Sequence, residues 1–505
     1  MKKQLLASPC ALRRTALALA LAALFAGCAV APTPITTDER AETLKLDRSI
    51  MYQQQEPLAR PLTLDEAMAR TVKYNLEGRL KLMEQALGLG QIDLARYDML
   101  PRLVAAAGYT SRDNELIMDS QDVATRKIVL GNTTSQDKNH NNYDLTFTWN
   151  ALDFGVSYYQ AHQQADRALI MEERRRKTTH QLMQQVRQAY WLAVGAQGLE
   201  GKVEPLLKQV NQALADAERV EREKLRPPLE TLNYRKAMLD IVRQLEAIRD
   251  ELSQAKPRLA SLMNLDPGTP YQLVVPGRLD LPNMPFTLQE MEEKALLQRP
   301  ELYEADLQER IGVTETKKAL VRMLPGLEIS TGAHYDSNSF MHNNRWADAG
   351  LRVTWNIFNV ISGPRQKELA EQQVEVSRLQ RLALNMAVLT QVHVAWRDYS
   401  GRMRQYELAD RLNDIDKKID EHTRAAAAND AQSKLNEIRS GVSALMAEYR
   451  RFQTYAALQS TYGQLVASLG EDPIPATVSE EDRSTVLNLA RKVGEHFSVK
   501  TGASQ

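Results

Sequence analysis

The sequence predicts a mainly helical fold with a small β part, in which long coiled-coil helices continue from four amphipathic β-strands. Three observations support this class. The chain contains an internal duplication, and each half contains two short segments with period-two alternation and two long helices with narrow apolar stripes. The 505 residues carry no net formal charge. This argues against a nucleic-acid-binding protein, because such proteins need a basic surface.

The N-terminus has the features of a bacterial export signal. Basic residues precede an apolar run from Ala16 to Ala26, which at about a dozen residues is too short to span a bilayer. Small residues before Cys28 resemble a lipoprotein cleavage site, at which the cysteine thiol is lipidated. Ala29, instead of an aspartate, follows the cysteine, and this resembles the pattern of lipoproteins sorted to the outer membrane. The usual leucine of that site is here Phe25, so cleavage of an ordinary signal peptide nearby is the alternative. In either case we expect export from the cytoplasm.

The two halves of the chain repeat each other in register. Matching pairs at an offset of 224 positions are Thr63 with Thr287 and Pro101 with Pro325, and pairs at an offset of 206 are Trp149 with Trp355, Gln185 with Gln391 and Asp266 with Asp472. The drop in offset places one deletion of 18 residues in the second half, opposite the stretch between Leu103 and Thr148. Chance matches would not keep register over such a distance, so the duplication is well supported.

The duplication and the composition predict six regions. They are a signal peptide at residues 1–27, an extended N-terminal segment at 28–61, a first structural repeat at 62–266, a proline-rich connector at 267–285, a second structural repeat at 286–475 and a C-terminal tail at 476–505. We expect each repeat to contain a helix, a β-hairpin and a long helix pair. The tail is polar and carries no recognisable motif.

Each repeat is expected to open with a helix. Thr63 with Glu66, and Thr287 with Glu290, have the spacing of a capping box. In such a box the hydroxyl accepts from the third backbone N–H and the carboxylate accepts from the N–H of the cap residue. Pro101 in the first half, and Pro325 in the second, then stops or kinks the helix.

Short segments with alternating polarity follow these helices. They run from Tyr143 to Asn150 in the first half, with a less regular partner from Leu103 to Arg112, and from Leu327 to Tyr335 and Ala347 to Asn356 in the second. Their length is close to the roughly 9–11 residues of a tilted transmembrane strand. Alternation suits a barrel wall with lipid on one side and water on the other. For one hairpin alone, a half-buried hairpin of a soluble sandwich is the alternative.

Trp149 and Trp355 lie at strand ends, where an aromatic girdle would meet the membrane interface. Four strands cannot close a barrel by themselves, since closed outer-membrane barrels need at least about eight. Lipid also offers no partner for the backbone groups of an open edge. Transmembrane strands of this chain must therefore be pooled with strands of other chains.

Two long helical stretches follow the strands. Residues 156–224 contain only Pro205, and residues 365–428 contain no proline. Each would approach about 100 Å as a helix. Return helices carry apolar residues at gaps of three and four, from Leu239 to Leu262 and from Leu445 to Leu469, which is typical of coiled-coil seams. We expect them to extend the pooled barrel as a tube, and a soluble coiled-coil protein is the alternative.

The order of these elements, repeated once, is similar to the TolC family of outer-membrane efflux proteins. The segment from Asn150 to Gly155 (NALDFG) looks like the family's motif at the barrel-to-helix junction, and Asn356 to Asn359 with Gly363 is a looser second copy. The last long helix ends at Gly470, which is similar to the family's C-terminal pattern. The resemblance covers roughly residues 60–475. It implies a homotrimer with a 12-stranded barrel and a periplasmic helical tunnel.

The resemblance further implies an exit duct in the outer membrane, within a tripartite efflux pump or a type I secretion system. It implies lipid anchoring, a periplasmic adaptor (membrane fusion) protein and an inner-membrane transporter of the RND or ABC class. No enzyme activity, metal or cofactor is expected, because the eight histidines are scattered and both cysteines lie near the N-terminus. The alternatives are a soluble periplasmic coiled-coil scaffold without a barrel and an envelope enzyme such as a hydrolase.

The resemblance also suggests a gate. In the family, acidic residues on the inner helix pair narrow the periplasmic entrance. The candidates in this chain are Asp414, Asp416, Asp420 and Glu421. A ring of carboxylates would repel anions and bind cations. Because Lys417 and Lys418 lie among them, a solvated charged face is the alternative.

The reversals between the long helices are the candidate contacts to the adaptor. The residues concerned are Leu225, Pro227, Pro228 and Leu232 in the first repeat and Asn429, Asp430 and Leu435 in the second. Leu232 and Leu435 could seat side chains of a partner. Closure of each coiled coil is an equally good interpretation of these two leucines.

Overall fold

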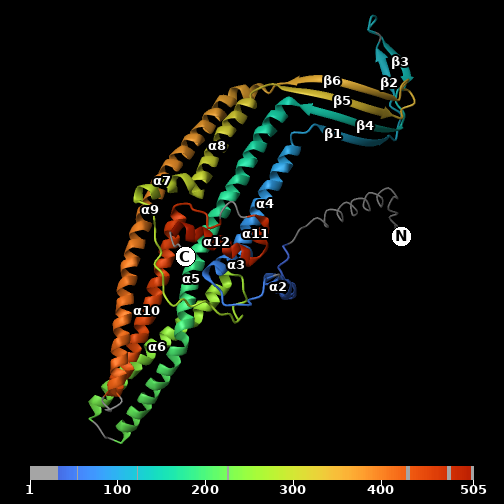
Figure 1. The fold of residues 1–505 in the computed structure, drawn as a ribbon. Coiled ribbons are helices and arrows are strands. Elements are labelled where there is room, and N and C mark those ends of the chain that lie inside the picture. Colours follow the sequence, from blue (N-terminus) through green and yellow to red (C-terminus); the bar gives the residue numbers. More distant parts are fainter. Residues whose placement is uncertain are drawn as a thin grey trace, which may run out of the picture. The chain divides into compact units, whose positions relative to one another are not determined.

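A computed structural model describes residues 32–53, 55–121, 123–223, 227–427, 433–474 and 479–501. The chain divides into two compact units, Met1–Gln55 and Glu56–Gln505. The fold is mostly helical with a small antiparallel sheet, as the sequence predicts. Figure 1 shows the elements with their labels.

The first unit contains one described helix, α2 (Thr37–Met51). Thr36 and Glu39 form a capping box at its N-terminus, with the Thr36 hydroxyl accepting from the Glu39 N–H at 3.2 Å. The expectation of an extended segment over residues 28–61 is therefore wrong for this stretch. The capping box, together with Glu, Lys, Leu and Arg residues of high helix propensity, accounts for the helix.

The second unit contains the same order of elements twice (Figure 1). The first copy consists of α3 (Leu64–Tyr74), α4 (Leu76–Tyr97), β1 (Arg102–Ser111), β4 (Asn139–Asn150), α5 (Ala151–Arg222) and α6 (Pro228–Leu262). The second consists of α7 (Leu288–Gln298), α8 (Pro300–Val321), β5 (Gly326–Asp336), β6 (Arg345–Thr354), α9 (Ile357–Ala427) and α10 (Ser433–Ser468). In the first copy a small hairpin, β2 (Met118–Gln121) and β3 (Ile128–Thr133), lies between β1 and β4. This hairpin occupies the stretch that the second half lacks.

Each copy opens with two helices rather than the one expected. Asn75 ends α3, and its side chain accepts from the N–H groups of Glu77 and Gly78 at 3.0 and 3.1 Å, which starts α4. In the second copy the break falls at Arg299, and Pro300 occupies the first position of α8. Both residue types favour a helix start, so each opening helix is divided in two at this point.

The four main strands form one antiparallel sheet in the order β1-β4-β5-β6. The outer layer of helices follows the same order, because α4 contacts α5, α5 contacts α8 and α8 contacts α9. Each strand joins its helix directly: α4 precedes β1, α5 follows β4, α8 precedes β5 and α9 follows β6. The sheet is thus continued, strand by strand, as a layer of helices (Figure 1).

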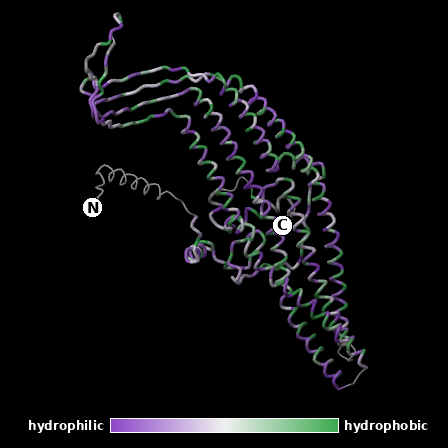
Figure 2. The backbone as a smooth tube through the Cα atoms, turned by 180° about the vertical axis from the view of Figure 1, so that it is seen from behind, coloured by the Kyte–Doolittle hydropathy of each residue, from purple (hydrophilic) through white to green (hydrophobic). Residues whose placement is uncertain are grey.

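The hydrophobic core lies where the long helices pack on their return helices. Helix α5 has 72 residues and α9 has 71, which corresponds to about 105 Å each. Val186, Tyr190, Leu245, Leu458 and Leu465 are among the buried side chains. Figure 2 shows hydrophobic and hydrophilic residues interspersed along the helices. Over the described residues, no helix combines the length and the apolar character needed to cross a membrane.

The C-terminal region forms two helices, α11 (Glu480–Ser484) and α12 (Val486–Thr501). Helix α12 packs against α3, with Val486, Leu489 and Val493 buried. Its first N–H, on Val486, donates to the Glu56 carboxylate at 3.0 Å. The sequence analysis describes this stretch only as a polar tail without a recognisable motif, and so it missed these helices. Apolar residues at i, i+3, i+4 and i+7 were the helical signal in this stretch.

Candidate functional site

The two faces of the sheet differ in polarity. Because aligned residues on neighbouring strands project to the same side, the register defines rows. Rows on one face are Ala105–Leu145–Ala333–Ala347, Trp149–Ile329–Leu351 and Tyr143–Tyr335. Rows on the other face are Asp144–His334–Trp346, Thr146–Gly332–Asp348 and Asn150–Glu328–Arg352. The sheet therefore has an apolar face and a polar face. In the isolated chain the apolar face is largely exposed, whereas the polar side chains of the inner strands β4 and β5 are mostly half-buried.

The two edges of the sheet lack partners within the described part of the chain. Strands β1 and β6 are the outer strands, and each pairs on one side only. Long unpaired edges are uncommon in monomeric soluble proteins, since they template aggregation. In lipid they are untenable, because the free N–H and C=O groups find no partner.

The outer helices, α4 and α9, expose apolar stripes beside these edges. The stripe on α4 consists of Leu76, Leu80, Met83, Leu87 and Leu94, and that on α9 includes Leu369, Val376, Leu379 and Met386. The members of each stripe are three, four or seven residues apart, the spacing of a coiled-coil seam. On α4 the stripe lies about 100° around the helix from Gly88 and Ala95, which are buried against α5. The α4 stripe is thus directed sideways, toward the position of a further helix in the same layer.

The predicted interface aromatics lie at strand ends, where the sheet passes into the helices. Trp149 packs against Phe154 with ring centroids 5.8 Å apart. Trp355 is 55% exposed, and its indole N–H donates to the Met323 carbonyl at 3.1 Å. Asn150, the residue after Trp149, caps α5: its side-chain oxygen accepts from the Leu152 N–H at 2.9 Å. A role for the tryptophans at a membrane interface stays a prediction.

The structure divides the four gate candidates on α9 into two pairs. Asp416 and Asp420 face the return helix α10: Asp416 accepts from the Ser443 hydroxyl at 3.2 Å, and buried Asp420 accepts from the Ser440 hydroxyl at 3.1 Å. Asp414 and Glu421 are exposed and lie seven residues apart, so they share the opposite side of the helix. Asp420 is buried and Asp416 half-buried, whereas both carboxylates of the second pair are exposed and make no contact with the described residues of α10 that fixes them.

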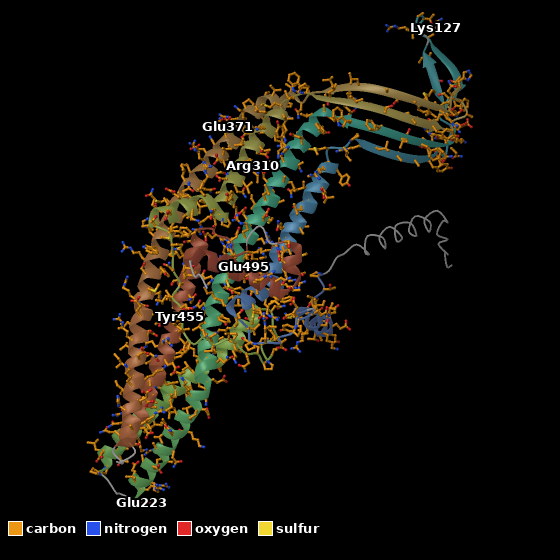
Figure 3. All side chains as sticks on the ribbon, viewed as in Figure 1. Lys127, Glu223, Arg310, Glu371, Tyr455 and Glu495 are labelled. Carbon is orange, nitrogen blue, oxygen red and sulfur yellow. The ribbon has the colours of Figure 1, made fainter. Side chains whose placement is uncertain are left out.

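The described candidates for contact with the adaptor lie on α6 and α10, at the end of the helices farthest from the sheet, which Glu223 marks in Figure 3. Pro227 is the N-cap of α6 and Pro228 its first residue. Leu232 is 49% exposed, whereas Leu435 is half-buried. Leu225, Asn429, Asp430 and the lipidation candidate Cys28 lie outside the described residues.

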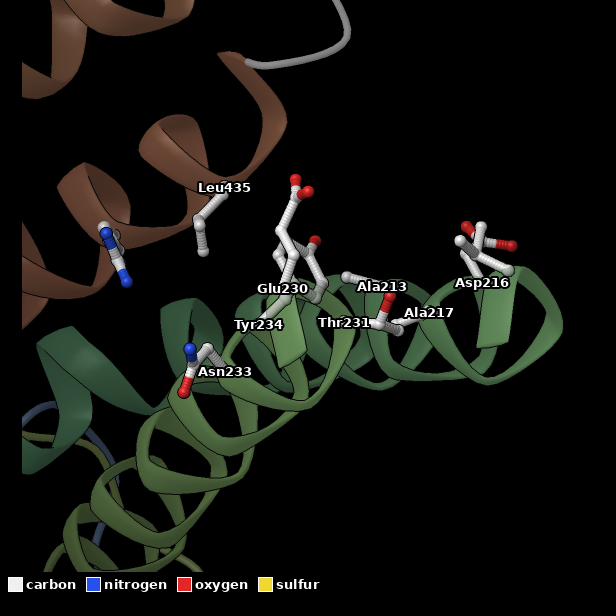
Figure 4. A pocket seen from close by; sticks show the side chains of 10 residues that line it. Ala213, Asp216, Ala217, Glu230, Thr231, Asn233, Tyr234 and Leu435 are labelled. Atoms are coloured by element: carbon white, nitrogen blue, oxygen red, sulfur yellow. The ribbon is translucent and has the colours of Figure 1, made fainter. Parts of the chain in front are cut away.

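A pocket of about 400 Å³ lies at this tip, between the α5–α6 hairpin and the start of α10. Leu435 faces it from α10, and its other walls include Ala213, Ala217, Thr231 and Tyr234 (Figure 4). Of the predicted tip residues that the structure describes, Leu435 alone lines the pocket, and sequence reasoning missed the other wall residues. The small side chains at i and i+4 on α5 were the available signal, but small residues are common in coiled coils and mark no pocket by themselves.

No reactive constellation emerges from the described residues. Among them, no group of three or more His, Cys, Asp or Glu side chains could hold a metal ion. The features that can act are the amphipathic sheet, the exposed seams, the acidic pair on α9 and the tip pocket. All four suit contacts with lipid, ions or other chains.

No protein-family model and no curated protein sequence matches the chain. Solved structures do match its fold. The outer membrane channel CmeC of Campylobacter jejuni is 12% identical with a TM-score of 0.62, over 84% of this chain and 89% of that one. The outer membrane channel MtrE of Neisseria gonorrhoeae is 14% identical with a TM-score of 0.61, over 81% and 89%.

A third match is the outer membrane protein VceC of Vibrio cholerae, which is 12% identical with a TM-score of 0.59, over 81% of this chain and 96% of that one. At such identities the likeness shows the fold. The matched region spans nearly the whole length of each of these proteins, so the agreement includes both repeats. The chain therefore has the fold of outer-membrane channel proteins, and this confirms the mostly helical chain fold with a small antiparallel sheet that its resemblance to the TolC family predicts. The trimer and its 12-stranded barrel stay predictions.

Proposed function

We propose that the chain is one protomer of an exit duct in the outer membrane, serving a tripartite efflux pump or a type I secretion system. One observation carries the proposal. An amphipathic sheet with two unpaired edges continues into a helical layer whose outer members both expose coiled-coil seams. Lipid requires a closed sheet, and four strands close only with strands from other copies.

The proposed assembly is a homotrimer with a 12-stranded barrel. In it, β6 of one copy pairs with β1 of the next, and the α9 stripe packs on the α4 stripe. Such a head-to-tail interface forms a ring when its rotation closes. The apolar face of the sheet then contacts lipid and the polar face lines an aqueous passage.

The tip of the helical layer is the proposed periplasmic entrance. Asp414 and Glu421 are the gate candidates, since their carboxylates are free to face a passage, and Asp416 and Asp420 serve to join α9 to α10. The tip pocket and Leu232 are the proposed docking site of a periplasmic adaptor, which would link the duct to an RND or ABC transporter. Cys28 is the proposed lipid anchor in the outer membrane.

The proposal is tested with neighbouring substitutions on the central strand β4. Leu145→Lys places a charge on the apolar face, at a cost of about 2–4 kcal/mol near the bilayer midplane. Thr146→Lys places the same charge on the polar face and should be tolerated. We expect wild type and Thr146→Lys to form trimers and conducting pores in planar lipid bilayers, and Leu145→Lys to lose most insertion.

Two other outcomes would contradict the duct. Equal insertion of both lysine variants would mean that the apolar face does not contact lipid. A wild-type protein that stayed monomeric in solution without detergent, and formed no pores, would instead support a soluble periplasmic scaffold.

The gate is tested by comparing the two acidic pairs. Asp414→Asn with Glu421→Gln should weaken the cation preference of the pores and their block by multivalent cations. Asp416→Asn with Asp420→Asn should alter these properties less, because those carboxylates bond to α10. If the first double variant conducted like wild type, the acidic pair would be an ordinary solvated face.

A further inference from the structure

The polar face of the sheet contains a histidine held between two carboxylates. His334 lies on β5, with Asp144 opposite it on β4 and Asp348 beside it on β6. Its Nδ1 is 2.6 Å from Asp144 Oδ1, and its Nε2 is 3.3 Å from Asp348 Oδ2. The ring of Trp346 stacks on the imidazole, with centroids 5.1 Å apart and planes 17° from parallel. Side chains of β4 and β6, on either side of β5, therefore define the position of this ring.

Gly332 provides the space in which the imidazole lies. A Cβ at this position would be 2.4 Å from His334 Nε2 and 3.1 Å from Asp348 Oδ1. Any larger residue would push the ring away from Asp348. The glycine, two residues before His334 on the same face, thus lets one imidazole reach the carboxylates of both neighbouring strands.

This geometry suits the imidazolium form of His334. A neutral imidazole carries one N–H, so one of its nitrogens would direct a lone pair at a carboxylate. In the imidazolium both ring nitrogens carry an N–H: Nδ1 hydrogen-bonds Asp144, and Nε2 lies within ion-pair distance of Asp348 without a hydrogen bond to it. Asp336 is the next charged residue on the same face of β5, so the charged groups around the ring are all acidic: Asp144 on β4, Asp336 on β5 and Asp348 on β6.

We infer that His334 makes the ion selectivity of the duct depend on pH, an inference that rests on the proposed function. As an imidazolium it cancels part of the acidic charge that Asp144 and Asp348 present to the passage. When it loses its proton, each protomer presents one further unit of negative charge, and a trimer presents three. Cation preference therefore rises with pH through His334, whose residue type titrates in the physiological range.

The test measures the reversal potential of single pores in a salt gradient, from about pH 5 to about pH 8, the range in which histidine ordinarily changes charge. We expect the cation-to-anion permeability ratio of wild type to rise about twofold, as screened unit charges near a water-filled passage would produce. His334→Gln, which has no titrating charge, should show the high ratio already at about pH 5. Asp144→Asn with Asp348→Asn should lower the ratio throughout.

Two variants sharpen the test. His140→Gln removes another histidine from the same face of β4, where His140 lies 3.3 Å from the Gln136 amide nitrogen, and it should keep the wild-type pH response. Gly332→Ala moves the imidazole from Asp348 and should weaken that response while pores still form.

The outcomes separate the inference from the function beneath it. Pores whose permeability ratio does not change with pH, or a His334→Gln variant that responds to pH like wild type, would overturn the inference and leave the duct intact. Wild-type protein without pores would overturn the proposed function itself.

Discussion

The two repeats end their return helices with the same left-handed turn, but they build it from different residues. Asn264 has a φ of 57° after α6, and Gly470 has a φ of 74° after α10, 206 positions later. At Gly470 a Cβ would lie 2.5 Å from the carbonyl carbon of Gln298, in the break between α7 and α8. Both repeats therefore require the left-handed turn. Only the second repeat requires a glycine there, because its turn passes directly over another backbone segment.

The aspartates after these turns differ in the same way. Asp266 accepts from the Gly268 N–H at 3.2 Å in an exposed turn. Its counterpart Asp472 accepts from His180 Nε2 at 2.8 Å and from Arg176 Nε at 3.1 Å. A duplicated motif has therefore kept its backbone role in one copy and acquired an ionic contact with α5 in the other.

The largest expected effect is on the turn in the second repeat. Gly470→Ala should lower the free energy of unfolding by more than about 3 kcal/mol, because a left-handed alanine is strained and its methyl meets backbone that cannot move cheaply. Asn264→Gly, in the first repeat, should change stability by less than about 1 kcal/mol. Chemical unfolding in detergent, followed by circular dichroism, measures both. Comparable losses would mean that the two turns are equally crowded.

The caps of the opening helices should give the next largest difference. Glu290 completes its capping box, with the carboxylate accepting from the Thr287 N–H at 2.7 Å. Glu66 instead lies 3.5 Å from the guanidinium of Arg70, which is 2% exposed. In Glu66→Ala the buried Arg70 guanidinium keeps only its hydrogen bonds to backbone carbonyls. We therefore expect the free energy of unfolding to fall by about 2–3 kcal/mol.

Glu290→Ala should lower the free energy of unfolding less than Glu66→Ala, because its carboxylate is exposed and its removal leaves no buried charge behind. The same unfolding experiment compares the two alanine variants. A Glu66→Ala loss no larger than that of Glu290→Ala would show that the Arg70 charge is satisfied without its carboxylate partner.

The smallest effect concerns Asp472. Burial raises the pKa of this carboxyl, but hydrogen bonds from His180 and Arg176 and the charge of Arg176 lower it more, so its pKa lies below the ordinary value of 3.8. A lowered pKa stabilises the fold above the ordinary value, and this contribution is lost as pH falls through the folded-state pKa. Asp472→Asn should cost about 1–2 kcal/mol at neutral pH, after allowance for partial exposure.

This aspartate contribution should disappear in acid, so wild type and Asp472→Asn should approach equal stability as the pH falls below about 4. Asp266→Asn should cost less than about 0.5 kcal/mol at any pH, because that turn is exposed. Unfolding free energies measured over a pH series provide the comparison. A constant gap between wild type and Asp472→Asn in acid would assign the loss to packing instead of charge.

The long-range pattern of this fold could be predicted because it depends on periodicity. The alternation near Tyr143 and Leu351 indicates strands, and the apolar stripe from Leu445 to Leu469 indicates a return helix, whatever their neighbours are. The helix break at Asn75 could not be predicted in the same way, since the decisive contacts are side-chain bonds to local N–H groups that an apolar pattern does not reveal.

The candidate sites were harder to predict for a related reason. A count along the chain groups Asp414, Asp416, Asp420 and Glu421 together, but their helical positions send two of them toward α10. The imidazole of His334 meets Asp144 across 190 positions of sequence and lies in space left by Gly332. Only the strand register brings these three together.

The joint between the repeats has a consequence for how such a ring is built. Strand β4 ends the first hairpin and β5 begins the second, and they pair in the middle of the sheet. In the proposed assembly, β6 and β1 stand in the same relation between chains. Each chain thus contains, in its own β4–β5 pair, a covalently linked equivalent of the β6–β1 contact that it forms with its neighbours in the proposed assembly. A half-length ancestor with that contact would have closed as a hexamer, and tandem fusion would have halved the number of separate pieces to be gathered.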